Sequence, residues 1–313
     1  MNGSPEIICI GMALVDSIIK GFDPNPVSAS GYRAVSGSLN VGGEAVNEAM
    51  AAAKLGVKTA VLTSLGVDEA GDMIIAGLER CGVDTQRIIR SPQHPTPVTT
   101  MFVREDGTRK SVTNNAHRYN FHPEQYTDRF TGAKALILGS LFRAPFDDPE
   151  IIYAVLQAAK AAGQTVFADT KLPNFRTLNL NDLAGSLELI DYITPNEDEA
   201  KYYSGKQEPE DMADVFLENG VRNVVIKLGG KGCFFKNEHG SLQLPPYKIR
   251  AVDATGAGDN FLAGFASEIL RGKTPQEALA FANACGAVCT TAVGAATALQ
   301  SREQVLQFME QQS

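Results

Sequence analysis

Residues 134–169 read KALILGSLFRAPFDDPEIIYAVLQAAKAAGQTVFAD. Two short apolar runs, 134–140 and 165–169, flank a segment whose apolar residues recur at helical spacing. The two runs predict buried strands, and residues 149–163 predict a helix that ends at Gly163. A strand, a helix and a second strand in this order favour a parallel pair joined by a crossover helix.

The same alternation extends in both directions along the chain. Further apolar runs at 189–195 and 222–229 predict strands after the first pair, and residues 6–12 predict one before it. We therefore expect an α/β protein with one central, mostly parallel sheet and helices on both faces.

Two other segments, 13–39 and 96–114, show the period-two alternation of exposed strands instead. The second contains a hairpin candidate that turns at Asp106 and Gly107, because Asp-Gly suits a tight two-residue turn.

Between these segments, residues 42–56 predict a helix closed by Gly56. The economical arrangement is a single α/β domain, 1–313, into which a small β lid is inserted as two segments, approximately 12–40 and 95–118. No internal repeat or linker is visible.

Composition restricts the class of partner. The 313 residues carry a formal charge of −8 without any long basic run, so nucleic acid and anionic membranes are unexpected partners. The start lacks a leader pattern and no apolar stretch is long enough to span a membrane, which predicts a cytoplasmic protein. Five cysteines, mostly inside apolar segments, predict reduced core thiols.

Residues 247–272, YKIRAVDATGAGDNFLAGFASEILRG, pass from a predicted strand through a glycine-containing turn into a helix. The apolar spacing starts the helix near residues 256–259. A helix N-terminus offers unpaired N–H groups and a partial positive charge, and small residues let an anion approach them. This turn is therefore a candidate phosphate or oxyanion site.

Two common glycine motifs do not explain the turn. A dinucleotide-binding fingerprint requires Gly or Ala where Phe261 stands. A Walker loop ending at residues 272–274 would need glycine in place of Ser267. Asp259 is either a first-turn carboxylate that favours the helix dipole or a general base beside an anion site.

Four motifs in order decide between these alternatives. They are LNVGGEAVNEAMAAAKLG (39–56), ITPNEDEAKYYSG (193–205), VVIKLGGKGCFF (224–235) and VDATGAGDNFLAGF (252–265). Together they closely resemble the signatures of the ribokinase-like (pfkB-type) carbohydrate kinase family. The resemblance implies a three-layer, Rossmann-like α/β fold with a small β-sheet lid.

The resemblance also implies roles for individual residues. Asp259 matches the catalytic base, and Asp16 matches an acidic residue that binds sugar hydroxyls; taken alone, Asp16 would be a polar residue of a lid strand. The anion hole would be formed by Gly256, Ala257 and Gly258. Positions that contact the substrate in the family correspond to Gly42, Gly43 and Asn47; an exposed helix position is the alternative for Asn47.

Asn196 and Glu199 match the motif that organises Mg²⁺ and the phosphates of ATP, largely through water; without the family, this segment predicts a capped helix start. The residues that would line the nucleotide are Lys227, Gly229, Gly232 and, on the last long helix, Asn283. A plain hairpin is the alternative for the first three.

Some positions depart from the family pattern. Ala254 stands where the family often has Ser or Thr, so a K⁺ site at Asp253 and Thr255 remains only a candidate. Asp169 and Lys171 lie where relatives vary. Lys171 is either a partner for an acidic group on the substrate or a surface lysine.

These features predict an ATP- and Mg²⁺-dependent kinase that phosphorylates a hydroxyl, most simply a primary one, of a sugar or sugar acid, with K⁺ as a further candidate cofactor. The family implies a homodimer formed through the lid. A nucleoside kinase of the same fold is an alternative, with a base pocket from Phe102, Tyr119 and Phe121. Another is a catalytically idle sugar- or nucleotide-binding regulator.

Overall fold

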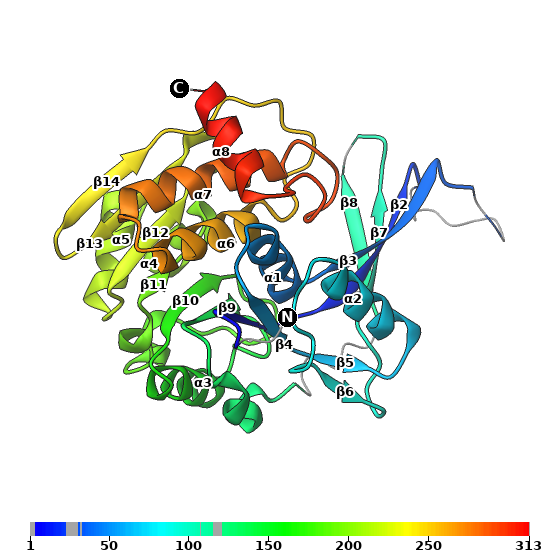
Figure 1. The fold of residues 1–313 in the computed structure, drawn as a ribbon, viewed down its shortest axis with the longest axis horizontal. Helices are drawn as coiled ribbons and strands as arrows, with labels where there is room; N and C mark the ends of the chain where they lie inside the picture. The colour runs from blue at the N-terminus through cyan, green and yellow to red at the C-terminus, as the bar shows by residue number, and fades with distance from the viewer. Residues whose placement is uncertain (1–3, 23–30, 32, 107, 115–120, 313) are drawn as a thin grey trace.

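A computed structural model describes residues 4–312 apart from 23–30, 32, 107 and 115–120. Its centre is an eight-stranded sheet (Figure 1). In spatial order the strands are β14 (Gly240–Leu244), β13 (Cys233–Asn237), β12 (Asn223–Lys227), β11 (Tyr192–Ile193), β10 (Thr165–Thr170), β9 (Ala135–Leu141), β1 (Ile7–Ile10) and β4 (Thr59–Leu62). Only the pairings of β13 are antiparallel, so the predicted α/β class is confirmed.

Helices cover both faces of this sheet. Successive residues of a strand point to opposite faces, and in the central strands the residues on both faces are apolar, so each face needs a covering layer. Ile7 and Cys9 of β1 pack in one apolar cluster and Ile8 and Ile10 in another. The first cluster lies under α1 (Glu44–Lys54), α2 (Glu69–Arg80), α6 (Ala257–Leu270) and α7 (Pro275–Cys289). The second lies under α3 (Pro149–Ala161), α4 (Glu197–Ser204) and α5 (Pro209–Glu218).

The remaining elements are short or peripheral. They are α8 (Arg302–Gln311), which packs on α7, the strand pair β5 (Ser64–Gly66) and β6 (Ile89–Ser91), and the 3-10 helices η2 (Pro123–Phe130), η3 (Leu180–Leu183), η4 (Leu187–Leu189) and η5 (Gly229–Lys231). All five cysteines are free thiols, and four are buried, as the sequence predicted. None of the helices in the described part of the chain has the length and hydropathy needed to cross a membrane.

A second, four-stranded sheet stands beside the large one at the end where α1 and α2 lie (Figure 1). Its order is β3 (Ser36–Gly42), β2 (Leu14–Lys20), β7 (Val98–Val103) and β8 (Arg109–Thr113). The predicted hairpin is present as β7 and β8. The Arg104 N–H donates to the Thr108 carbonyl, so the turn has three residues between these two positions and not the two that were predicted.

The two faces of the small sheet differ in chemistry. Strand pairing places Asp16 beside Asn40 and Thr99 on one face. Leu39 pairs with Ser17, and Val112 pairs with Thr100. Ser17 and Thr100 directly follow Asp16 and Thr99 in their strands, so Leu39 and Val112 lie on the opposite face of the sheet.

This arrangement contradicts the predicted base pocket. Phe102 pairs with Ile19, so it lies on the face opposite Asp16. Phe121 is buried in the core of the large domain. Tyr119 lies outside the described residues. Of the three predicted pocket residues, the two that the structure describes, Phe102 and Phe121, therefore do not line the face with Asp16.

Most predicted boundaries agree with the structure, and one strand is wrong. The helices predicted to end near Gly56 and Gly163 are α1 and α3, and α6 begins directly after Gly256. The strand predicted from residue 247, before the turn into α6, is absent. Pro245 and Pro246, which directly precede it, have no N–H groups to continue the ladder beyond β14.

The turn between the small sheet and α1 depends on a glycine. Gly43 has φ 98°, and a β-carbon built there would lie 2.4 Å from the Met12 carbonyl oxygen. Gly163 also has a positive φ, of 73°, but no atom within 4 Å of such a β-carbon.

We expect Gly43→Ala to lower the free energy of unfolding by about 2–5 kcal/mol, since it adds backbone strain and a steric clash. Gly163→Ala, with the strain alone, should lower it by about 1–2 kcal/mol. Urea titration followed by circular dichroism measures both. Equal losses would show that the contact with Met12 costs nothing.

Candidate active site

The candidate site lies at the carboxyl ends of the parallel strands. There β1 pairs with β4 on one side and β9 on the other, so the chain order reverses between β1 and β9. In open α/β folds, such a reversal leaves a crevice at the carboxyl ends of the two strands, and ligands bind there. Gly139 of β9 makes room here, because a β-carbon at this position would lie 2.9 Å from Glu48 Oε2.

Asp259 projects from the first turn of α6 but does not cap it. The Asn47 amide on α1 donates a 2.7 Å hydrogen bond to Asp259 Oδ2. Both side chains are buried, so the interpretation of Asn47 as an exposed helix residue is wrong. Burial raises the pKa of Asp259, while Lys171, 4.0 Å from its Oδ1, opposes that rise.

The N-terminus of α6 has free backbone donors. Gly256 is the N-cap of α6 and has φ 77°. A β-carbon built on Gly256 would lie 2.3 Å from the β-carbon of Ala295, so no larger residue fits there. The Ala257 N–H donates to the Ala254 carbonyl. The N–H groups of Gly258 and Asp259 have no hydrogen-bond partner within the described part of the chain. The predicted anion hole therefore has its open donors at Gly258 and Asp259.

Asp169, at the end of β10, is the centre of an ion-pair network. Its Oδ1 accepts from Lys227 Nζ at 2.5 Å and from the Thr194 hydroxyl at 2.9 Å, and its Oδ2 accepts from Lys171 Nζ at 3.2 Å. Burial would raise the pKa of Asp169, but the two lysines outweigh it and the pKa is lowered. Lys227 Nζ also lies 3.2 Å from a β-carbon built on Gly258. Its charge therefore stands at the N-terminus of α6.

Lys171 is not a surface lysine. Its ammonium lies between Asp169 and Asp259, and only 21% of its side chain is exposed. Burial alone would lower its pKa, but the charges of Asp169 and Asp259 outweigh burial and raise it. Lys171 therefore remains protonated and balances the two carboxylates.

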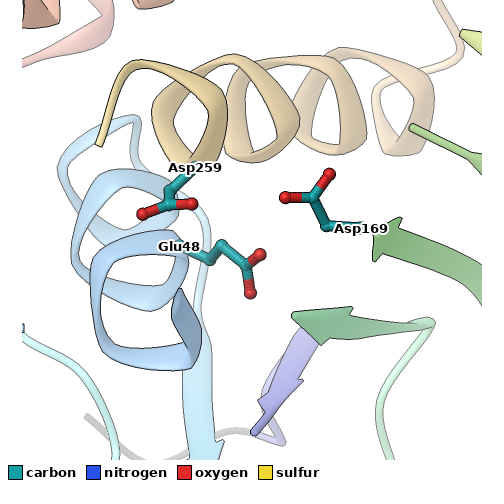
Figure 2. Close-up of side chains that lie close together, drawn as sticks. All are labelled: Glu48, Asp169 and Asp259. Atoms are coloured by element: carbon teal, nitrogen blue, oxygen red, sulfur yellow. The ribbon is translucent and has the colours of Figure 1, made fainter. Parts of the chain in front are cut away.

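Glu48 is a site residue that the sequence interpretation missed. Figure 2 shows its side chain on α1 close to Asp259 and Asp169, and oxygens of the three carboxylates lie within 4.8 Å of one another. Glu48 is fully buried, and neither of its oxygens has a hydrogen-bond partner among the described residues. Burial, followed by the Asp259 charge, raises its pKa well above the usual range.

A cluster of three carboxylates can hold a metal ion, but here the Lys171 ammonium supplies the positive charge. A signal for Glu48 was present in the sequence. It is an acidic residue between Ala45, Val46, Ala49 and Met50, the positions that the helical spacing assigns to the buried face.

The small sheet brings an acidic residue to the same helix. A β-carbon on Gly42 would lie 2.7 Å from Asp16 Oδ2. Burial, followed by the charge of Glu44, raises the pKa of Asp16. Asp16, Gly42 and Gly43 therefore lie together at the start of the helix that carries Asn47.

Asn196 and Glu199 form the capping box that the sequence predicted. The Asn196 side-chain oxygen accepts from the Glu199 N–H, and Glu199 Oε2 accepts from the Asn196 N–H and the Thr170 hydroxyl. Burial and the Asp169 charge raise the pKa of Glu199. Because the Asn196 side-chain oxygen already accepts from the Glu199 N–H, the Asn196 side chain helps to hold Glu199 in place.

The predicted nucleotide residues fall into two groups. Lys227 lies at the centre of the site, as described above. The others lie beyond the end of β12: Gly229 and Gly232 flank the turn to β13, where a β-carbon on Gly232 would meet the Leu244 carbonyl. Asn283 donates weakly, at 3.4 Å, to the adjacent Pro245 carbonyl.

Asp253 ties two loops together. Its Oδ1 accepts from the N–H and hydroxyl of Thr255, and its Oδ2 accepts from the Gly294 N–H. Burial would raise the pKa of Asp253, but these hydrogen bonds outweigh it and the pKa is lowered. The carboxylate is thus satisfied without a cation, and K⁺ binding stays a prediction.

Comparisons with known proteins agree with this geometry. A family model described as pfkB family carbohydrate kinase matches residues 4–302. The 2-dehydro-3-deoxygluconokinase of Bacillus subtilis is 31% identical and the ribokinase of Haemophilus influenzae 29%. The matches cover 88% of both chains in the first case, and 86% of this chain and 87% of the relative in the second.

Among solved structures, Arabidopsis thaliana ribokinase complexed with ribose and ATP is similar with a TM-score of 0.85 and 26% identity, over 98% of this chain and 99% of the other. The fold and its relatives define a phosphotransferase that takes an alcohol group as acceptor. This chain belongs to the pfkB family of carbohydrate kinases.

The raised pKa of Asp259 predicts a stability penalty with a defined sign. A folded pKa above the unfolded value means that the native state binds more protons in that window, so stability falls as pH rises through it. Asp259→Asn removes the charge, and we expect it to raise the unfolding temperature at pH 7 by on the order of 2 °C. The difference should vanish below about pH 4.

Asp253→Asn is the matched control with the opposite sign, because the pKa of Asp253 is lowered. This variant should be less stable than the unmutated protein at pH 7, and the deficit should disappear as pH falls through the lowered folded pKa. Differential scanning calorimetry from pH 3 to 8 measures both. A destabilised Asp259→Asn protein at pH 7 would contradict the prediction.

Proposed function

We propose that this protein transfers the γ-phosphoryl group of Mg·ATP to a hydroxyl, most simply a primary hydroxyl, of a sugar or sugar acid. One observation carries the proposal. A buried carboxylate, Asp259, is oriented by Asn47 within one turn of the free N–H groups that start α6. A base beside an anion site is what phosphoryl transfer to an alcohol requires.

Asp259 would take the proton from the attacking hydroxyl. Burial helps here, since a carboxylate with a raised pKa is a stronger base. Asn47 has a second function available: its buried side-chain oxygen has no partner within the described residues. That oxygen can accept a hydrogen bond from the acceptor while the amide holds Asp259.

The phosphoryl group would be stabilised by the N–H groups of Gly258 and Asp259 and by Lys227, whose ammonium lies next to Gly258. Asp169 holds Lys227 in place. Gly229, Gly232 and Asn283 would contact the rest of the nucleotide.

Glu199 fits Mg²⁺ because it is a hard oxygen donor whose Oε2 is fixed by two hydrogen bonds. It would hold the ion largely through water, with Asn196 as its support. Bound Mg²⁺ would neutralise phosphate charge. For K⁺, Asp253 and Thr255 remain the candidate ligands.

The sugar would bind between Asp16, Gly42, Gly43 and Asn47, with the small sheet acting as a lid. A carboxylate accepts hydrogen bonds from neighbouring hydroxyls, and the two glycines let the acceptor approach the backbone. Closure would exclude water and so favour transfer over hydrolysis of ATP. Ribose and ATP bound to the Arabidopsis relative support both substrate classes.

The alternatives have less support. A regulator without activity would not need Asp259, Asn47, Lys227 and Glu199, all of which are present and held by hydrogen bonds to neighbouring site residues. A nucleoside kinase would need an apolar base site, and neither Phe102 nor Phe121 provides one.

Asp259→Asn tests the mechanism. We expect phosphorylation of the best acceptor to fall by about 10²–10⁴-fold, because the general base is lost, while ATP still binds. Coupled ADP-release assays over a panel of sugars and sugar acids measure turnover, and calorimetry measures ATP binding. Asp72→Asn, at an exposed ion pair with Arg90, is the control. Undetectable turnover by the unmutated protein with every sugar would refute the kinase proposal.

We also propose that two chains pair through the small sheets. On the face opposite Asp16, Leu39 and Val112 are 61% and 64% exposed, and nearby Val35 is 79% exposed. Leu39 and Val112 lie on the two edge strands of this sheet, and exposed apolar side chains across one sheet face are typical of an interface. A homodimer would cover them and leave the face with Asp16 to the sugar.

Leu39→Glu should weaken this dimer, because it would bring a pair of charges into the interface. We expect the dissociation constant to rise at least tenfold in analytical ultracentrifugation. Val67→Glu, at a residue 65% exposed and outside the small sheet, is the matched control. A monomeric unmutated protein, or equal effects of both changes, would contradict the proposal.

A further inference from the structure

The end of the site that faces the proposed acceptor is crowded with acidic residues. These are Asp16, Glu44, Glu48, Asp169 and Asp259. Lys171 and Lys227 supply positive charge, but both already contact Asp169, and Lys171 also faces Asp259. Two of the five acids are thus paired with two lysines, and three are left over.

Glu44 and Asp16 are the partly exposed members of this group. Glu44 is the first residue of α1, one turn before Asn47 and Glu48, so the three share a face of the helix. The β-carbon of Glu44 lies 3.1 Å from one built on Gly139, where Glu48 Oε2 also lies. Glu44 is partly exposed, and no hydrogen bond or ion pair joins its carboxylate to the residues that the structure describes.

The effects of the Glu44 charge on nearby pKa values agree with this placement. Burial is the largest cause of the raised pKa of Asp16 and the Glu44 charge is the second, and the Glu44 charge also contributes to the raised pKa of Asp259. Glu44 therefore acts on both the lid side and the catalytic side of the acceptor position.

We propose that Glu44 makes the site selective for uncharged acceptors, so that a neutral sugar is preferred over the corresponding sugar acid. This rests on the proposed kinase function and narrows its substrate class. A carboxylate on the acceptor would meet Glu44 and Asp16, and the two lysines that the structure describes at this site, Lys171 and Lys227, are already paired with Asp169. Like charges brought close together in a partly buried site weaken binding.

Lys171 is the obvious objection, since a lysine beside the base could bind an acidic group. Its ammonium is 3.2 Å from Asp169 Oδ2 and 4.0 Å from Asp259 Oδ1. A sugar carboxylate would have to displace one of these carboxylates, and the displaced group would then be buried without a partner. Lys171 is better suited to balance Asp259 than to recognise an acid.

The test compares pairs of acceptors that differ in a carboxylate: D-ribose with D-ribonate, D-glucose with D-gluconate, and D-fructose with 2-dehydro-D-gluconate. Isothermal titration calorimetry measures binding, and ADP release measures turnover. We expect the neutral member of the best-bound pair to bind at least tenfold more tightly. Glu44→Gln, which keeps the side-chain shape, should reduce this ratio at least fivefold by improving binding of the acid.

Glu69→Gln is the matched control, because Glu69 is also the first residue of a helix, α2, and is exposed. It should leave the ratio unchanged. The ratio of the unmutated protein should also fall as salt rises, which needs no variant. Circular dichroism confirms that each variant is folded.

Tighter binding of the acid, or a ratio that Glu44→Gln does not change, would overturn the inference and leave the kinase proposal standing. Binding of a neutral sugar without any ADP formation would overturn the kinase proposal and leave the charge selectivity standing. Failure of every sugar and acid to bind would overturn both.

Discussion

The site depends on the charge balance around Asp169. A carboxylate buried at the end of a central strand is stable only with compensating charge and hydrogen bonds, and Lys227, Lys171 and Thr194 supply them. These contacts join β10 to β12 and to the loop after β10, and they bring Lys227 beside the start of α6. The proposed phosphate site therefore has its cation because Asp169 is buried.

The same balance restricts the rest of the site. Lys171 neutralises part of the charge of Asp259, but Glu48 lies within the same few ångströms and has no partner among the described residues. Burial is the main reason why the pKa values of Asp259 and Glu48 are raised, and the charges of neighbouring carboxylates raise both further. The buried carboxylates that allow this site to take up a proton therefore also lower the stability of the folded protein.

Much of this arrangement could be predicted from local sequence. The strand and helix order followed from apolar periodicity, and the starts of α1 and α6 followed from glycines before amphipathic runs. The strand expected at 247–252 was wrong, because apolar alternation there was outweighed by the prolines that end the ladder after β14. Glu48 was missed because helical spacing predicts which face is buried, not which distant carboxylates meet it.

By itself, the sequence determined the α/β class and the four motifs, since these depend on periodicity and on residues adjacent in the chain, and the resemblance of those motifs to the family implied Asp259 as the candidate base. Only the tertiary structure decided that Lys171 balances Asp259, that the Thr170 hydroxyl donates to Glu199, and that Phe102 lies on the face of the small sheet opposite Asp16. Those facts depend on contacts between residues far apart in the chain and on strand register, and the electrostatic energies of buried groups are set by such contacts.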